Sequence, residues 1–394
     1  MTNLMQGFPP APDAQVTLAN WRKPPHNRWA FQHVRELVPS TDIANDPGAV
    51  RVLPSATVDL SGIQVPDGGT TLPFGAFLER TDTDALVVLH HGRLVYEHYA
   101  NGMTDHTPHI LMSVSKSVLG LLVGILAGRG ELDPEAPVAT YVPEVAGTAY
   151  ADARLRDLLN MRAGVLFDED YLATAGPIIE YRKATNWEPL GPGQSPSDLR
   201  SFYATLTERD GPHGRPFHYI SINTDLLGWC IERATGRRYA DLVSELLWQP
   251  MGAERSAYIT VDRLGAPRCA GGFCCTARDL ARVGLLFAEG GNDVVPEPWL
   301  DDIVAGGDKQ AWDQGAGAVN YQGLPMRYRS QWYVLERPSP MAFAIGVFGQ
   351  SLYVDRSNGI VIAKFSCQPL PVNVEHKLLT IRAAEAVRDY LIGG

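Results

Sequence analysis

Residues 109–120 read His109-Ile-Leu-Met-Ser113-Val-Ser-Lys116-Ser-Val-Leu-Gly120, and an apolar run extends from Leu121 to Gly128. This length and apolar content predict a buried helix that ends near Gly128 and Gly130. Ser113 and Lys116 are three positions apart, so a helix places both side chains on one face, one turn apart. At that spacing the nitrogen of the lysine can reach the oxygen of the serine.

The apolar surroundings supply the chemistry that this pair needs. Desolvation disfavours the charged form of a lysine, so burial lowers the pKa of Lys116 and leaves part of the amine neutral near pH 7. A neutral amine can take the proton of Ser113 and make its oxygen a nucleophile. The structural alternative is a helix that Ser113 caps, with Lys116 reaching solvent along apolar surface. The motif favours a serine hydrolase whose base is a lysine.

Segments on both sides of the motif predict an antiparallel sheet. Two β-rich runs surround a Gly-containing turn within residues 85–100, which is the pattern of a hairpin. Further strand patterns occupy much of the last third of the chain, over residues 331–335, 342–349, 351–355 and 360–366. We therefore expect strands from both ends of the chain to assemble into one sheet.

Helix signals complete the expected α+β fold. A Thr cap and a terminal glycine predict a helix over residues 276–290, and a second helix is expected from about Val374 to Ile392. Residues 133–266 show short helical patches and few strand patterns. We expect residues 1–132 and 267–394 to form a sheet domain flanked by helices, and residues 133–266 to form an inserted, mostly helical domain. The site is expected in the cleft between them.

Composition excludes several classes of partner. The 394 residues are 45% apolar and carry a formal net charge of −10, so a nucleic acid is not an expected partner. The amino terminus lacks the basic start and apolar run of a secretory signal, and no run of 18 apolar residues indicates a membrane span. We expect a cytoplasmic protein without a membrane partner. The five cysteines predict neither a disulfide framework nor a zinc site.

The sequence gives no reason to expect a metal or a cofactor. The pair His90-His91 lies in the predicted hairpin, where neighbouring side chains point to opposite faces, so a shared metal is not expected. No glycine-rich nucleotide loop follows a strand.

Several strings together identify a family resemblance. The chain resembles the serine β-lactamase and penicillin-binding-protein superfamily, and within it the 6-aminohexanoate-dimer hydrolases and related carboxylesterases. The resemblance covers nearly the whole chain, and its strings are Pro24-Pro-His-Asn-Arg-Trp-Ala-Phe31, Leu111-Met-Ser-Val-Ser-Lys-Ser117, Asp168-Glu-Asp-Tyr171, Ile259-Thr-Val-Asp262, Cys275-Thr-Ala-Arg-Asp-Leu-Ala-Arg-Val-Gly284 and Gly349-Gln-Ser-Leu-Tyr-Val-Asp355. It implies a β-lactamase-like fold and is compatible with a homodimer.

The resemblance also assigns roles to single residues. It implies that Ser113 is the nucleophile, that Lys116 is its base, and that Tyr219 is a third catalytic group that passes the proton to the leaving atom. Backbone N–H groups of Ser113 and Val347 are the implied donors to the oxyanion. The alternative for Tyr219 is an aromatic residue at the start of a helix that Asn223 caps.

Four further positions match substrate-contacting residues of the family. Tyr171 matches a tyrosine on a mobile loop, and Trp187 matches an aromatic residue that closes over the pocket. Either could instead be a core aromatic residue. An Asp that holds the substrate ammonium in efficient nylon-dimer hydrolases falls at or beside Arg182, where a cation would repel an amine, unless Glu180 takes its place. An Asn that supports the same activity aligns with Ala270.

The penicillin-recognition boxes are also altered. The Lys-Thr-Gly box is absent, and Gly346-Val-Phe-Gly-Gln350 stands in that region without a Lys or Arg to hold a β-lactam carboxylate. The second box reads Tyr219-Ile-Ser221, with its Asn displaced to Asn223. These departures disfavour efficient action on β-lactams.

We therefore expect an acyl-serine hydrolase of small carboxyl esters, with linear amides as further substrates. The alternatives are a 6-aminohexanoate-oligomer amide hydrolase, a β-lactamase or D,D-peptidase, an acyltransferase, and a non-catalytic binding protein that retains the cleft.

Overall fold

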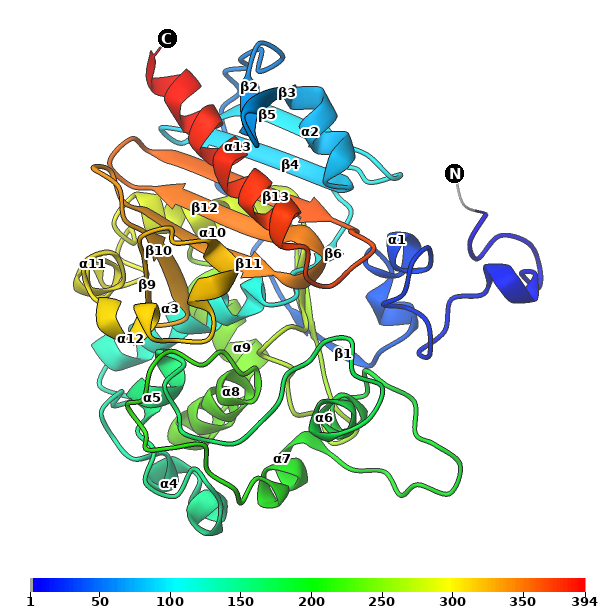
Figure 1. The fold of residues 1–394 in the computed structure, drawn as a ribbon, viewed down its shortest axis with the longest axis vertical. Coiled ribbons are helices and arrows are strands. Elements are labelled where there is room, and N and C mark those ends of the chain that lie inside the picture. The colour runs from blue at the N-terminus through cyan, green and yellow to red at the C-terminus, as the bar shows by residue number, and fades with distance from the viewer. Residues whose placement is uncertain (1–2, 394) are drawn as a thin grey trace.

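The computed structural model describes residues 3–393, and a seven-stranded antiparallel sheet lies at its centre (Figure 1). The strands follow the order β5-β4-β13-β12-β11-β10-β9, so the N-terminal hairpin pairs with the C-terminal strands, as the sequence predicts. Their bounds are Thr83–His90 for β4, Arg93–Tyr99 for β5, Met326–Arg329 for β9, Trp332–Leu335 for β10, Met341–Gly346 for β11, Gln350–Asp355 for β12 and Ile360–Ser366 for β13. The α+β class of the fold is confirmed.

The hairpin of β4 and β5 turns at two left-handed residues. His91 has a φ of 46° and Gly92 a φ of 73°, as a tight two-residue hairpin turn requires. His91 therefore lies in the turn and not in a strand, and its ring centroid is 4.3 Å from that of His90. The expectation that these two side chains point to opposite faces is wrong, because the alternation of a strand stops at the turn.

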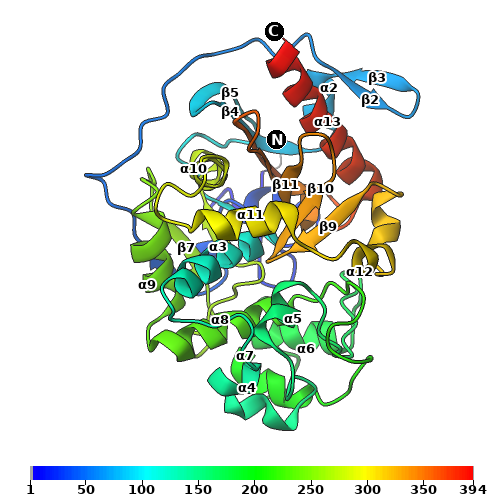
Figure 2. The same ribbon diagram turned by 90° about the vertical axis from the view of Figure 1, so that its left-hand side faces the viewer.

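Alternation along β4 gives the sheet two buried faces. Ala85, Val87 and Leu89 enter one apolar cluster, which also includes side chains of α3 (Val114–Gly128) and α10 (Ala277–Ala288). Leu86 and Val88 enter a second cluster, which includes side chains of α2 (Phe74–Arg80) and α13 (Val374–Gly393). The sheet therefore lies between these two sets of helices (Figure 2).

The two helices predicted near the C-terminus are confirmed. Helix α10 begins after Thr276, whose side chain accepts a hydrogen bond from the backbone N–H of Asp279 at 3.2 Å. It ends before Gly290, which has a φ of 76°. Two short helices follow it, α11 (Glu297–Ala305) and α12 (Lys309–Asp313), and the 3₁₀ turn η6 (Ala318–Tyr321) precedes β9.

A second, four-stranded sheet was not expected from the sequence. Its order is β1-β7-β8-β6, with bounds Ser40–Ile43, Ala257–Thr260, Phe273–Cys275 and His109–Ile110. These strands are two to four residues long, too short to show a period of two. Strand β6 leads directly to Ser113, so this sheet fixes the start of α3. A separate hairpin joins β2 (Gln64–Asp67) to β3 (Thr70–Pro73).

Residues 133–266 contain short helices and the strand β7. In Figure 1 these helices lie below the seven-stranded sheet. Their bounds are Val138–Tyr141 for α4, Pro143–Gly147 for η3, Leu155–Leu159 for α5, Pro177–Ala184 for α6, Leu199–Phe202 for α7, Tyr203–Thr205 for η4, Ile222–Thr235 for α8, Tyr239–Val243 for α9 and Ser244–Trp248 for the π-helical turn η5.

The first residues pack against distant parts of the chain. The indole N–H of Trp21 donates to the carbonyl of Trp187 at 3.2 Å. The side chain of Asn27, at the start of α1 (Asn27–Ala30), donates to the carbonyls of Cys367 and Gln368. The remaining short turns of this segment are η1 (Pro12–Ala14) and η2 (Val34–Glu36).

Gly346 allows the end of β11 to approach the turn before Ser113. A Cβ atom at this position would lie 2.6 Å from the carbonyl oxygen of Leu111 and 3.0 Å from the Cβ of Met112. Real Cβ atoms do not approach backbone oxygens so closely, so a side chain here would push the strand away from the turn.

We expect Gly346→Ala to lower the free energy of unfolding by about 1–3 kcal/mol, because the added methyl group overpacks this contact. Urea denaturation followed by circular dichroism measures the change. The control is Gly75→Ala in α2, where a Cβ atom would meet nothing within 4 Å. Equal stability of the two variants would contradict the close approach.

Candidate active site

The backbone presents Ser113 on a tight turn. Met112, directly before it, has a φ of 47°, an unusual value for a residue with a side chain. Ser113 is the N-cap residue of α3, but its side chain caps no backbone N–H of the helix. The structural alternative of a capping serine is therefore not what the structure shows. The hydroxyl of Ser113 is instead free to interact with Lys116.

Lys116 is buried, with 1% of its surface exposed, and its Nζ donates three hydrogen bonds. The acceptors are the hydroxyl of Ser113 at 2.9 Å, the hydroxyl of Ser221 at 3.0 Å and the carbonyl of Ala270 at 2.7 Å. Desolvation by burial lowers the pKa of Lys116 to about 7, although the negative charge of Glu169 opposes the shift. The amine does not reach solvent, and with a pKa near 7 a part of it is neutral at neutral pH and able to accept a proton.

Glu169 forms the outer part of this hydrogen-bond chain. The hydroxyl of Ser221 donates to its Oε1 at 2.5 Å, and the backbone N–H of Ser221 donates to its Oε2. The hydroxyl of Tyr171 donates to Oε1 at 2.6 Å. Glu169 and Ser221 were not predicted to be site residues, although they stand in Asp168-Glu-Asp-Tyr171 and Tyr219-Ile-Ser221. Ser221 contacts Lys116 where the altered second box has serine in place of Asn.

Ala270 holds Lys116 through its backbone. Its carbonyl accepts the hydrogen bond from Lys116, while its N–H donates to Oδ1 of Asp225 at 2.7 Å. Asp225 is paired with the guanidinium of Arg268 and accepts from the hydroxyl of Tyr181 at 2.5 Å. The buried pair Asp225–Arg268 therefore fixes the carbonyl that binds the lysine, which is a different role from the side-chain role that the alignment suggested.

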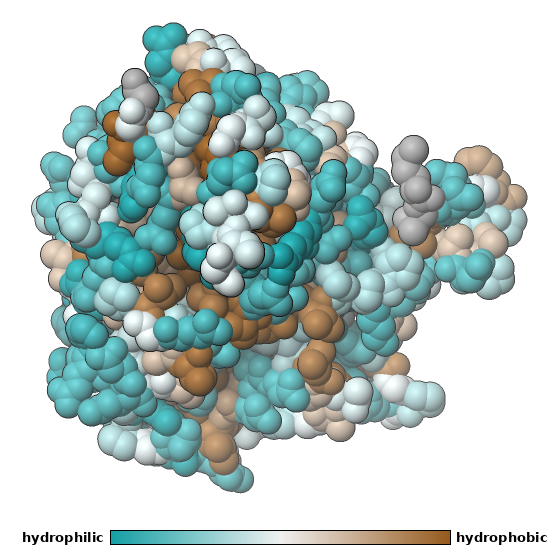
Figure 3. Space-filling view, turned by 45° about the horizontal axis from the view of Figure 1, so that its top comes forward, coloured by the Kyte–Doolittle hydropathy of each residue, from teal (hydrophilic) through white to brown (hydrophobic). Residues whose placement is uncertain are grey.

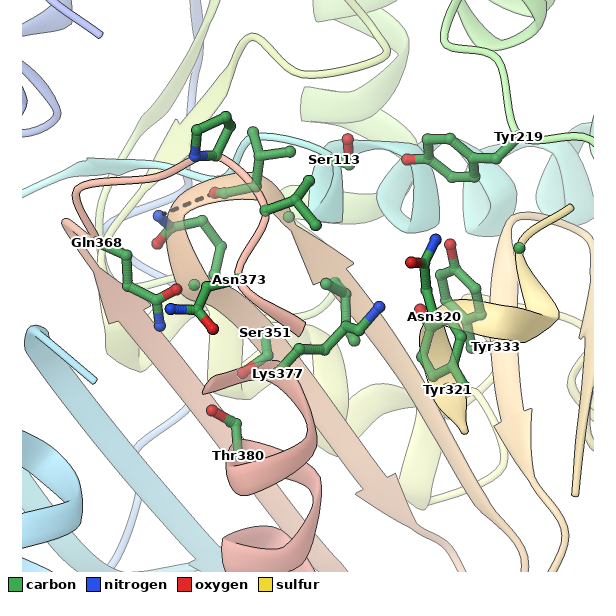
Figure 4. A pocket seen from close by; sticks show the side chains of 18 of the residues that line it. Ser113, Tyr219, Asn320, Tyr321, Tyr333, Ser351, Gln368, Asn373, Lys377 and Thr380 are labelled. Carbon is green, nitrogen blue, oxygen red and sulfur yellow. Dashed lines mark hydrogen bonds between the residues drawn. The ribbon is translucent and has the colours of Figure 1, made fainter. Parts of the chain in front are cut away.

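Tyr219 lies beside both Ser113 and Lys116. Its hydroxyl points toward Ser113 in Figure 4, and the Nζ of Lys116 is 4.8 Å from the centroid of its ring. Burial raises the pKa of Tyr219 well above its usual value, so the phenol keeps its proton. Asn223, the alternative that the sequence offered as a helix cap, lies inside α8. Its side chain accepts a hydrogen bond from the hydroxyl of Tyr150 at 2.6 Å and does not cap the helix.

A cavity of about 180 Å³ opens beside Ser113 and Tyr219. It is lined by aromatic residues of several elements and by the end of β11, while its far side is formed by η6 and α13 (Figure 4). Val319, on η6, and Val372, just before α13, are exposed valines with 76% and 46% of their surfaces exposed. Figure 3 shows hydrophobic side chains gathered across the middle of one face, between polar regions. These features suit a small, partly apolar ligand.

The predicted substrate residues divide into two groups. Tyr171 lines this cavity, as does Val347, which was predicted as an oxyanion donor. Three others are not among its lining residues: Trp187 donates to the hydroxyl of Thr260 and packs on Trp21, Arg182 donates to the carbonyl of Tyr171 at 3.0 Å, and the side chain of Ala270 is buried. Glu180, weighed as a substitute for an acid near Arg182, pairs with Lys183 at 2.8 Å on the exposed side of α6.

One lysine that lines the cavity was not predicted from the sequence. Lys377, in the first turn of α13, lines the cavity beside Asn320 and Tyr321. It lies about 30 positions beyond the absent Lys-Thr-Gly box, so no motif spacing connects it with Ser113. As expected, residues 346–350 contain no Lys or Arg. The cavity nevertheless has a cation, because Lys377 reaches it from α13.

Within residues 3–393, no group of three or more His, Cys, Asp or Glu side chains could hold a metal ion. Over the same part of the chain, no helix has both the length and the apolar character that a membrane crossing demands.

Comparison with known proteins identifies a family model and relatives that are similar to this chain. Residues 74–386 match the family model described as Beta-lactamase. The chain is 37% identical over 369 residues to the 6-aminohexanoate-dimer hydrolase of Paenarthrobacter ureafaciens, an alignment that covers 92% of this chain and 91% of that protein. Esterase EstB of Burkholderia gladioli is 28% identical over 189 residues, 45% of this chain and 47% of the esterase.

A solved structure is similar over nearly its whole length. It is a Bacillus anthracis protein provisionally named a 6-aminohexanoate-dimer hydrolase, with a TM-score of 0.85 and 27% identity, and the match covers 98% of this chain and 99% of that one.

We expect Glu169→Gln to lower the pKa of Lys116 further, because the variant removes a negative charge that favours the ammonium form. The rate at which a fluorophosphonate labels Ser113, measured against pH, reports this pKa. The midpoint is expected near pH 7 in the unmodified protein and about one unit lower in the variant. Glu180→Gln, which removes an exposed charge, is the control, and an unchanged or raised midpoint in Glu169→Gln would contradict the coupling.

Proposed function

This chain belongs to the beta-lactamase family of serine hydrolases, and on that premise we propose that it hydrolyses small carboxyl esters through an acyl-enzyme on Ser113. The observation that carries the proposal is the 2.9 Å contact between Ser113 and Lys116, whose amine is buried and has a pKa of about 7. A lysine in that state acts as a base at neutral pH, and an exposed lysine does not.

Acylation begins when neutral Lys116 takes the hydroxyl proton of Ser113. The oxygen of Ser113 attacks the carbonyl carbon, and the carbonyl electron pair becomes the oxyanion of a tetrahedral intermediate. The N–H groups of Ser113 and Val347, both at the cavity, are the donors assigned to this oxyanion. Collapse of the intermediate reforms the carbonyl and breaks the bond to the leaving oxygen.

The leaving oxygen takes a proton from Tyr219, and the phenol is reprotonated by the ammonium of Lys116. Support comes from the direction of the Tyr219 hydroxyl, the nearness of Lys116 to its ring and the raised pKa of the phenol. In the second half of the reaction, water gives a proton to Lys116, its oxygen attacks the acyl carbon, and Ser113 leaves with a proton returned from the lysine. The products are the carboxylic acid and the alcohol.

Linear amides are the second class of substrate that we propose. The relative with 37% identity is named for hydrolysis of an amide dimer, and the same set of side chains can protonate an amine. Glu180 pairs with Lys183 on the exposed side of α6, and position 182 is occupied by a cation, so neither position gives the described cavity an acid for a substrate ammonium. We therefore expect turnover of the 6-aminohexanoate dimer to be slower than turnover of simple esters.

We expect Ser113→Ala to lower kcat/KM on p-nitrophenyl butyrate at least about a thousandfold, because the variant cannot form the acyl-enzyme. Released p-nitrophenolate measures the rate, and mass spectrometry of the quenched enzyme detects the butyryl adduct on residue 113. Ser117→Ala, one turn further along α3, is the control. Wild-type rates in Ser113→Ala would refute the proposal, and efficient nitrocefin turnover would favour a β-lactamase instead.

We expect the loss of rate in Tyr219→Phe to depend strongly on the leaving group. A p-nitrophenolate ion departs without a proton, so its release is expected to slow by less than about tenfold, whereas ethanol needs the proton and release from ethyl butyrate is expected to slow by about a hundredfold or more. Chromatography of released butyrate measures both rates. The exposed Tyr390→Phe is the control, and an equal loss on both esters would remove Tyr219 from the proton transfer.

A further inference from the structure

The cavity beside Ser113 contains one formally charged side chain among the described residues that line it. The other lining residues are apolar, aromatic or neutral polar, and Lys377 alone is a Lys, Arg, Asp or Glu. A single ammonium in a largely apolar cavity is costly to maintain without a partner, because burial disfavours the charge.

Lys377 has no acidic partner within the described part of the chain. Burial lowers its pKa to about 8, and no neighbouring carboxylate offsets this effect. Its Nζ lies 3.9 Å from the centroid of the Tyr321 ring, a cation–π contact that stabilises the charge but leaves the other side of the ammonium free. In Figure 4 the side chain extends from α13 into the cavity toward Asn320. An ammonium so placed is available to a ligand.

Neutral polar groups accompany this ammonium. Asn320 lines the same end of the cavity, and so does the hydroxyl of Ser351, on β12, which is buried with 2% exposure beside the hydroxyl of Tyr353. These neutral groups can donate hydrogen bonds to a ligand oxygen. The end of the cavity formed by η6, β12 and α13 therefore offers one cation and neutral donors.

The position of Tyr219 tells which part of a substrate enters this cavity. Tyr219 lines the cavity, and in the proposed reaction it donates its proton to the leaving atom. Arg182, Trp187 and Ala270, which the family alignment assigns to the substrate, do not line it. Ser113, Tyr171 and Val347 also line the cavity, and we assign the leaving group to it from the place of Tyr219.

We propose that Lys377 forms an anion subsite that recognises a carboxylate carried by the leaving group of the substrate. The favoured substrates are esters of ω-hydroxyalkanoates, in which a short apolar chain spans the cavity between the scissile oxygen and the carboxylate. This inference rests on the proposed function for its reaction and adds a specificity-determining residue to it.

The test compares ω-(butyryloxy)alkanoates that have three to six methylene groups with the matching carboxamides. The acyl group and the reacting oxygen are the same in both series, so only the distal charge differs. For at least one chain length, the wild-type enzyme is expected to show a kcat/KM about tenfold higher on the carboxylate than on the carboxamide, mainly through a lower KM. Equal values across the whole wild-type series would overturn the proposal.

Lys377→Met is expected to abolish the preference for the carboxylate, so that the ratio of kcat/KM on each carboxylate to kcat/KM on its matching carboxamide falls from about ten to about one. Lys377→Arg is expected to retain most of the preference, and the exposed Lys23→Met to retain all of it. Lys377→Gln repeats the test if the methionine variant does not fold. A preference that survives in both neutral variants would overturn the role of Lys377.

Two further measurements distinguish the anion subsite at Lys377 from the proposed ester hydrolysis through Ser113. Monoethyl glutarate and ethyl butyrate differ by a carboxylate on the acyl side, and a loss confined to monoethyl glutarate in Lys377→Met would place the subsite on the acyl side and overturn our assignment. Turnover of the carboxamide series that disappears in Ser113→Ala supports the proposed hydrolysis whatever happens at Lys377. Turnover that persists in Ser113→Ala removes the proposed function itself.

Discussion

Burial of the Lys116 amine is the constraint on which the rest of the site depends. An amine without access to water must find its hydrogen-bond partners inside the protein, and here they come from three separate parts of the chain: Ser113, Ser221 and Ala270. One acceptor is a backbone carbonyl, which cannot itself be protonated. The amine is therefore held by neutral groups, and the carboxylate of Glu169 is linked to it through the hydroxyl of Ser221. A direct carboxylate partner would keep the lysine charged and unable to act as a base.

Segments outside the site hold the hydrogen-bond partners of Lys116 in position. The four-stranded sheet fixes the chain just before Ser113, and the absence of a side chain at Gly346 lets the end of β11 approach the same turn. The buried pair of Asp225 and Arg268 fixes the segment of Ala270. A buried ion pair is weak evidence for stability, but it defines position well, and position is what the lysine needs.

The elements that could be predicted from the sequence are those with a local signal, such as a hydrophobic period, a helix cap or a turn. The helix of Ser113 and Lys116, the hairpin before it, the helix after Thr276 and the C-terminal strands all follow from periodicity and caps, and the α+β fold follows from them. The short strands of the second sheet carry no such signal. Glu169, Ser221 and Lys377 could not be singled out, because their roles depend on tertiary contacts and not on spacing. His91 shows the opposite error: strand alternation was extended into a residue that forms the turn.

The charge of the whole protein sharpens the question of what enters the cavity. A net charge of −10 does not attract an anionic substrate from a distance, and salt screens such fields beyond about 10 Å. Recognition of a carboxylate at Lys377 therefore depends on contact within the cavity, where the dielectric is low and, in the described part of the chain, no acid competes for the ammonium. Such a subsite raises the affinity for substrates that carry a carboxylate, and it does not raise the rate at which they meet the enzyme.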